Sequence, residues 1–135
     1  MDSLLVVGCG DVARRALPAL AARWRVTALV RRPDISLAER GVAMVVGDLD
    51  APATLGPLAH GFRGFDGVLH LAPPPESGPG DPRTAHLVAA LAAKGMLPER
   101  FVYISTSGVY GDCGGERVDE SRPVHPHSAR AQRRV

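Results

Sequence analysis

Short apolar segments alternate along this chain with longer stretches of helical composition. Residues 4–7 read Leu-Leu-Val-Val, and similar apolar runs recur up to residue 105, each bounded by glycine, proline or charged residues. Runs of this length between turn-forming residues predict buried strands. The predicted strands are residues 3–8, 25–30, 43–46, 67–71 and 100–105.

The stretches between these strands predict helices. They cover residues 11–23, 36–40, 54–61 and 82–94, and the tail 128–135 also has helical composition. Asp81 is placed to cap the fourth helix and Pro82 to occupy its first position, while Gly95 suits its C-terminal cap. Gly56 and Pro57 are expected to interrupt the third helix.

Strands that alternate with helices indicate a parallel sheet with crossover helices, which is an α/β fold. Right-handed crossovers most simply give a doubly wound sheet of five strands in the order 3-2-1-4-5. A chain of 135 residues is expected to form one domain, residues 1–135. In this topology ligands bind at the carboxyl ends of the first and fourth strands.

A glycine turn follows the first strand and precedes the first helix, with the sequence Gly8-Cys9-Gly10-Asp11-Val12-Ala13. Such a turn leaves backbone N–H groups at a helix N-terminus, where a pyrophosphate can bind. Gly8 permits the sharp turn, Gly10 lets the phosphate approach the backbone, and Ala13 is small enough for helix and strand to pack. The predicted cofactor contacts are therefore Gly8, Gly10, Asp11, Val12 and Ala13.

Two arginines, Arg31 and Arg32, end the second strand. Domains that prefer NAD place an acid near this point for the ribose 2′-hydroxyl, whereas an arginine pairs with a 2′-phosphate. Asp34 is a rival acid, but Pro33 is expected to turn the chain away from the strand first. We expect NADP rather than NAD; the alternative is that both arginines are solvated loop residues.

The third and fourth strands also end in candidate residues. Asp48 and Leu49 follow the third strand, and the Asp48 carboxylate either accepts from the adenine amino group or forms a turn. Leu71 and Ala72 are apolar or small and leave room for a ribose and nicotinamide. His70 is expected to pack against its neighbours rather than act as a base.

The fifth strand runs into three hydroxyl residues, Ser105, Thr106 and Ser107. They are candidates for hydrogen bonds to a substrate, and the alternative is that they satisfy the backbone of the turn. Further on, His125 and His127 flank a proline in a spacing that matches no zinc pattern, so we expect no metal site.

Composition narrows the functional classes. The net charge is only +2, which gives no support for nucleic-acid binding. Cys9 and Cys113 form no metal or disulfide framework, as expected in a reducing compartment. No signal peptide opens the chain and no apolar run approaches the roughly 18 residues of a membrane span, so we expect a cytoplasmic protein without membrane association.

Taken together, the glycine turn, the Gly47-Asp48-Leu49 step, the His70-Leu71-Ala72 step and residues 105–111 resemble an extended or atypical short-chain dehydrogenase/reductase. The likeness is closest to the NAD(P)-dependent epimerase/dehydratase branch. Residues 118–126 also resemble the loop that follows the Val-Tyr-Gly step in that branch. The resemblance implies a Rossmann-type fold that holds NADP or NAD across the first four strands. It also implies a small hydroxy or carbonyl substrate, such as a sugar nucleotide, contacted by Thr106.

The chain departs from this family at the proton-transfer pair. Family members carry a tyrosine and a lysine four residues apart, and aligning Pro126-His127-Ser128 with their approach segment puts Arg130 and Arg134 there. Arginine stays protonated and is no ordinary general acid or base near neutrality. Arg134 remains a candidate to hold a ribose hydroxyl or phosphate.

Family members also continue into a C-terminal substrate-binding subdomain, so we expect this chain to be a truncated product or fragment. A poorly covered final helix and strand edge predict either self-association, into a homo-oligomer, or instability. Three functions remain open: an NADP-dependent oxidoreductase or epimerase, a silent dinucleotide-binding module or redox-sensing regulator, and a nucleotide-gating domain of an ion transporter. The third does not explain residues 105–111.

Overall fold

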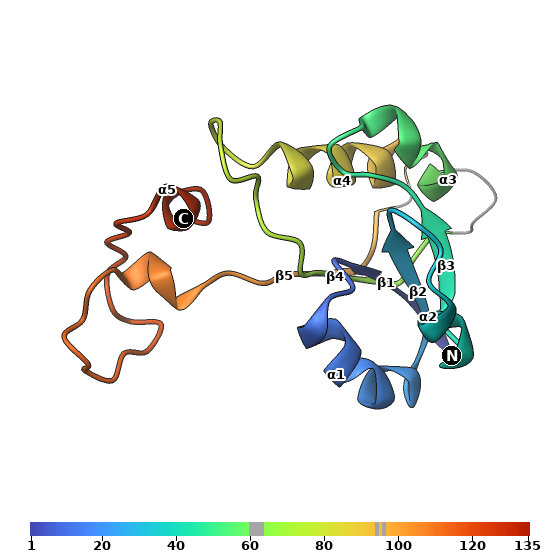
Figure 1. The fold of residues 1–135 in the computed structure, drawn as a ribbon, viewed down its shortest axis with the longest axis horizontal. Helices are drawn as coiled ribbons and strands as arrows, with labels where there is room; N and C mark the ends of the chain where they lie inside the picture. Colours follow the sequence, from blue (N-terminus) through green and yellow to red (C-terminus); the bar gives the residue numbers. More distant parts are fainter. Residues whose placement is uncertain (60–63, 94, 96) are drawn as a thin grey trace. The chain divides into compact units, whose positions relative to one another are not determined.

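The computed structural model describes residues 1–59, 64–93, 95 and 97–135. Its five-stranded sheet has the order β3-β2-β1-β4-β5, as the sequence predicts (Figure 1). The strands are β1 (Asp2–Val7), β2 (Trp24–Val30), β3 (Ala43–Val46), β4 (Gly67–His70) and β5 (Arg100–Tyr103). The helices are α1 (Asp11–Ala21), α2 (Ile35–Glu39), η1 (Pro52–Leu55), α3 (Gly56–Ala59), α4 (Pro82–Ala92), η2 (Ser107–Tyr110) and α5 (Ala129–Gln132).

The chain forms two compact units. The first comprises residues 1–73 and 83–104 and contains the whole sheet, and the second comprises residues 74–82 and 105–135. In the first unit all neighbouring strands pair in parallel, with Val7 opposite both Leu29 and His70, and His70 opposite Tyr103. The loops that follow the strands therefore start at one edge of the sheet, where the sequence predicts a site.

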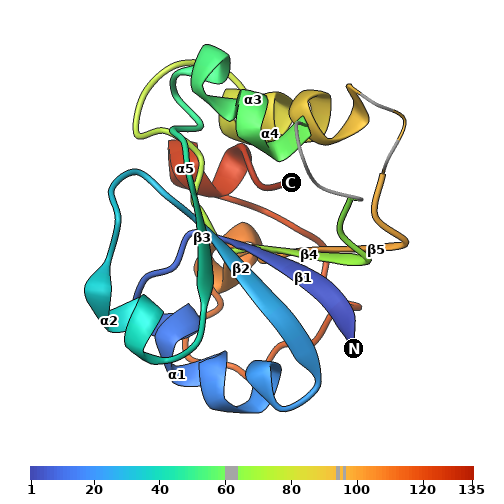
Figure 2. The ribbon, with the colours of Figure 1, turned by 90° about the vertical axis from the view of Figure 1, so that its right-hand side faces the viewer.

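Helices cover both faces of this sheet, with α1 and α2 on one side and α3 and α4 on the other (Figure 2). The side chains of β1 alternate between two cores: Leu4 and Val6 pack on one face, and Leu5 and Val7 on the opposite one. The first core consists of Leu4, Val6, Ala13, Leu17, Val26, Ala28, Leu37 and Val42. The second consists of Leu5, Val7, Leu29, Val45, Leu49, Leu55, Leu58, Phe65, Val68, Leu87 and Leu91. Apolar contact on both faces explains why the strands read as unbroken hydrophobic runs.

Helix α1 contains a proline at position 18. Proline has no N–H, so the carbonyl four residues earlier, that of Arg14, loses its helical partner. The Arg40 guanidinium donates to this carbonyl at 3.3 Å. A side chain from just beyond α2 thus replaces the missing backbone bond, and α1 continues through Pro18 to Ala21.

Several predicted boundaries differ from the structure. The helical segment changes at Gly56 from the 3-10 helix η1 to α3, which is where the sequence predicts an interruption, and Pro57 is accommodated in the first turn of α3. Residues 60 and 61 of that predicted helix, and Lys94 at the end of the fourth, lie outside the described residues. The predicted tail helix is confined to Ala129–Gln132. Among the helices of the described ranges, none has the length and apolar character needed to cross a membrane.

The second unit is built around short helical turns and a glycine crossing. The Ser128 hydroxyl caps α5 by accepting from the Ala131 N–H at 3.0 Å. Gly111 has φ +71°, and a Cβ there would lie 2.8 Å from the His127 ring and still closer to the His125 carbonyl. Only glycine allows residues 125–127 to pass this point. No three metal-ligating side chains converge in the described parts of the chain.

Candidate functional site

A cavity of about 740 Å³ opens at the carboxyl edge of the sheet in the first unit. The loops that follow β1, β2, β3 and β4 form its walls. Eight residues singled out in the sequence line it: Gly8, Gly10, Arg31, Arg32, Asp48, Leu49, Leu71 and Ala72. Asp34, the rival acid of the sequence, lines it too, as do Cys9, Arg14, Asp50 and Arg83, for which the sequence suggested no role.

The two glycines of the turn have different physical reasons to be glycine. Gly8 has φ +85°, and a Cβ there would lie 2.6 Å from the backbone nitrogen of Ala72, so the loops after β1 and β4 touch backbone to backbone. Gly10 has φ −88° and nothing within 4 Å of a built Cβ, so its missing side chain leaves open space. That space lies at the N-terminus of α1, where the first N–H groups have no acceptor within the helix.

The next three residues take separate positions. The Asp11 carboxylate pairs with Arg15 at 3.0 Å on an exposed surface, and the Val12 side chain is 62% exposed. Ala13 is fully buried in the core beneath α1, as expected for close packing of helix and strand. None of these three side chains is among those that line the cavity.

The end of β2 brings three charged side chains to the cavity. The sequence predicts that Pro33 turns the chain away before Asp34. This prediction is wrong, because Asp34 lines the same cavity as Arg31 and Arg32. Both arginines are exposed, and neither forms an ion pair with another described residue.

Asp34 is instead already bonded to other groups of the protein. One carboxylate oxygen, Oδ2, accepts from Arg14 at 2.5 Å, and the other, Oδ1, accepts from the backbone N–H and the hydroxyl of Ser36 at 2.9 and 2.7 Å. The bonds from Ser36 and Arg14 lower the pKa of Asp34 to about 2. Asp34 is therefore a carboxylate at any physiological pH, with an arginine already beside it.

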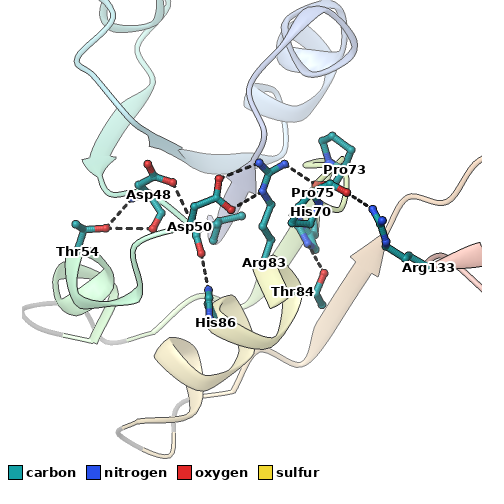
Figure 3. Close-up of polar contacts among 11 residues, drawn as sticks. Asp48, Asp50, Thr54, His70, Pro73, Pro75, Arg83, Thr84, His86 and Arg133 are labelled. Carbon is teal, nitrogen blue, oxygen red and sulfur yellow. Dashed lines mark hydrogen bonds and ion pairs between the residues drawn. The ribbon is translucent and has the colours of Figure 1, made fainter. Parts of the chain in front are cut away.

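A second ion pair joins the loops after β3 and β4 to helix α4 (Figure 3). Arg83, in the first turn of α4, holds both oxygens of Asp50 at 2.8 and 2.9 Å and donates to the Pro73 carbonyl at 3.0 Å. The Arg83 guanidinium keeps the pKa of Asp50 below its usual value. The loops after β3 and β4 are thus fixed to one helix. The order of the strands is the one sequence-level indication of this contact, because it places both loops and the start of α4 at the same edge of the sheet.

Asp48 has the turn role that the sequence left open. Its side chain accepts from the Asp50 N–H at 2.9 Å, and its own N–H donates to the Thr54 hydroxyl at 2.8 Å (Figure 3). Asp48 also lines the cavity, so the turn presents this carboxylate to any ligand there.

His70 is a packing residue, as expected. Its side chain is completely buried, its Nε2 lies 2.8 Å from the Thr84 hydroxyl, and its ring stacks on Tyr103 with the ring centres 5.0 Å apart. A ring held between a strand and a helix in this way is part of the core.

Thr106 and Arg134 belong to the second unit. The Thr106 hydroxyl accepts from the Gly108 N–H at 3.3 Å and caps η2, which is the local role left open in the sequence. Arg130 approaches Glu76 at 3.6 Å, and Arg133 donates to the carbonyls of Pro75 and Glu76. Arginines of this segment therefore hold residues 75–76 within the second unit.

Comparisons with known proteins agree with this geometry. The sequence model of a family described as NAD(P)H-binding matches residues 8–134. A conserved protein of unknown function from Silicibacter pomeroyi is 31% identical over 99% of this chain and 45% of its own, with a TM-score of 0.74. The UDP-glucose 4-epimerase of Thermus thermophilus, solved with NAD, is 24% identical over 98% of this chain and 47% of its own, with a TM-score of 0.75.

The uronate dehydrogenase of Agrobacterium tumefaciens is 22% identical over 99% of this chain and 52% of its own, with a TM-score of 0.74. At these identities the epimerase and the dehydrogenase show a shared fold. This chain spans about half the length of each of the three structures. Among curated proteins, no sequence matches it significantly.

Proposed function

This chain belongs to the NAD(P)H-binding family, and on that premise we propose that the cavity of its first unit binds NADP(H) in preference to NAD(H). One observation carries the preference. Asp34, the acid nearest the end of β2, is already bonded to Arg14 and Ser36, whereas Arg31 and Arg32 are exposed along the same cavity. A 2′-phosphate pairs with an arginine fork, and the 2′-hydroxyl of NAD instead needs an acceptor.

The rest of the cavity suits the remainder of a dinucleotide. The open space at Gly10 and the N-terminus of α1 favour the pyrophosphate, because N–H groups and the helix dipole both stabilise negative charge. Asp48 and Leu49 are our candidates for the adenosine side, and Leu71 and Ala72 for the nicotinamide side. When bound, the cofactor supplies a hydride donor or acceptor.

Binding without turnover is the second candidate function, and Arg130 and Arg134 favour it for this chain. A guanidinium remains protonated and exchanges no proton with a substrate hydroxyl near neutral pH. Arg130 is also already close to Glu76. The catalytic alternative is a reaction on a sugar nucleotide or another small hydroxy or carbonyl compound, with Thr106 contacting the substrate. It requires a proton donor other than Arg130 and Arg134.

The cofactor assignment is tested by charge reversal at position 31. We expect Arg31→Asp to reverse the preference from NADPH to NADH in calorimetric titrations, because the new carboxylate accepts from a 2′-hydroxyl and repels a 2′-phosphate. An unchanged ratio of the two dissociation constants would show that Arg31 does not touch the 2′ position. Hydride transfer is followed separately by NADPH absorbance. Turnover that Thr106→Val abolishes would exclude the silent-module function.

A further inference from the structure

We propose that Arg14 is a positioning residue for cofactor choice: by occupying Asp34 it keeps that carboxylate from acting as a ribose acceptor. The inference rests on the proposed function, since it concerns the 2′ end of the same cavity. No motif of the sequence marks Arg14, which follows the glycine turn directly. Its importance comes from the contact it makes with the loop after β2.

The contact joins two elements that both reach the cavity. Arg14 projects from α1 and donates from Nη2 to Asp34 at 2.5 Å and from Nη1 to the Ser36 hydroxyl at 2.7 Å. Arg14 and Asp34 both line the cavity, and each side chain is 32% exposed. The pair therefore lies at the wall of the site and not inside the core. A ligand in the cavity is close enough to interact with its charges.

The occupancy of the carboxylate explains the effect on a ribose. A carboxylate offers about four acceptor positions, and Arg14 and the two Ser36 donors use three of them. The guanidinium also neutralises the charge that would repel a 2′-phosphate. With Arg14 in place, Asp34 is a poor acceptor for NAD and a tolerable neighbour for NADP.

The two oxygens of Asp34 have separable roles. Oδ1 caps α2 through the Ser36 N–H, and Oδ2 is the oxygen that holds Arg14. Removing Arg14 frees Oδ2 and leaves the cap bond in place. Asparagine at position 34 keeps a capping oxygen but carries no charge, because asparagine is as good an N-cap as aspartate. This separation makes the inference testable without dismantling the loop.

The experiment is a double-mutant cycle that measures the dissociation constants of NADPH and NADH by calorimetry for the wild type, Arg14→Met, Asp34→Asn and the double variant. We expect Arg14→Met to shift the ratio toward NADH by about tenfold, the scale of one charge-assisted hydrogen bond. The shift disappears in the Asp34→Asn background, because Arg14 acts through Asp34. Arg14→Lys, which keeps the positive charge, restores most of the wild-type ratio. Thermal melting checks that each variant is folded.

Three results overturn the inference. Arg14→Met with an unchanged ratio means that the ion pair has no influence on cofactor choice. A loss of NADPH binding that persists in the Asp34→Asn background means that Arg14 binds phosphate directly. A full shift in Arg14→Lys means that charge at position 14 is not what matters. If the wild type binds neither dinucleotide, or binds NADH better, the proposed function itself fails.

Discussion

Gly8 and Ala72 lie so close together that a Cβ on residue 8 would be 2.6 Å from the Ala72 backbone nitrogen. This approach joins the loop after β1 to the loop after β4. In a doubly wound sheet the order of the strands reverses between these two strands. The site is therefore built on a backbone contact that has no room for a side chain.

The first prediction separates crowding from backbone conformation. Gly8→Ala should lower the free energy of unfolding by more than about 2 kcal/mol, because a positive φ strains alanine and its Cβ meets backbone. Gly41 has φ +76° and nothing within 4 Å of a built Cβ, so Gly41→Ala should cost only the strain, about 1 kcal/mol. Urea unfolding of both variants measures the difference, and equal losses would contradict the close contact.

Gly10 should behave in the opposite way. Its φ is −88° and its surroundings are open, so Gly10→Ala should lose only the preference of the α1 N-cap for glycine over alanine, about 1 kcal/mol. The added methyl group projects into the space that we assign to the pyrophosphate. NADPH affinity should therefore fall by at least about tenfold, the equivalent of losing one charge-assisted hydrogen bond. A folded Gly10→Ala protein with unchanged affinity would place the pyrophosphate elsewhere.

The third prediction concerns acid. Asp34 has a pKa of about 2 in the folded protein, below its ordinary value of 3.8, so its interactions stabilise the fold above about pH 4. This contribution is lost as the pH falls through 2, because protonation removes the charge that holds Arg14.

Asp34→Asn isolates this effect from the other carboxylates whose pKa is lowered, such as Asp50 and Asp66. The difference in unfolding free energy between the wild type and Asp34→Asn should be constant from pH 7 to about pH 4 and shrink below it. A difference that stays the same down to pH 2 would mean that the Asp34 carboxylate gains nothing from Arg14 and Ser36.

The fourth prediction concerns the second unit. Gly111→Ala should speed amide hydrogen exchange throughout residues 105–135, because the added Cβ would collide with the segment around His125 and His127. Gly115 has a similar φ, +80°, and open surroundings, so Gly115→Ala is the matched control and should change exchange only locally. Similar exchange in the two variants would contradict the crossing at Gly111.

The sheet could be predicted from the sequence because buried strands carry their signal locally. Residues 4–7 are apolar on both faces, and the glycine turn after them marks where a helix starts. The same reasoning placed Gly8, Gly10, Arg31 and Ala72 at one edge. Fold class and the neighbourhood of the site thus follow from patterns within short windows.

The ion pairs could not be predicted in this way. Arg14 meets Asp34 across 20 residues and Arg83 meets Asp50 across 33, so only the folded chain brings the partners together. The sequence predicts that Pro33 turns the chain away from β2, so that Asp34 lies far from the site. Instead, Asp34 lies at the cavity, and its carboxylate is occupied because Arg14 donates a hydrogen bond to it.

Titration of the wild-type protein with NADPH and with NADH tests the central proposal most directly. We predict that NADPH binds at least about tenfold more tightly, because Arg31 and Arg32 are exposed along the cavity while Asp34 is held by Arg14. NADH binding that equals or exceeds that of NADPH would contradict the account.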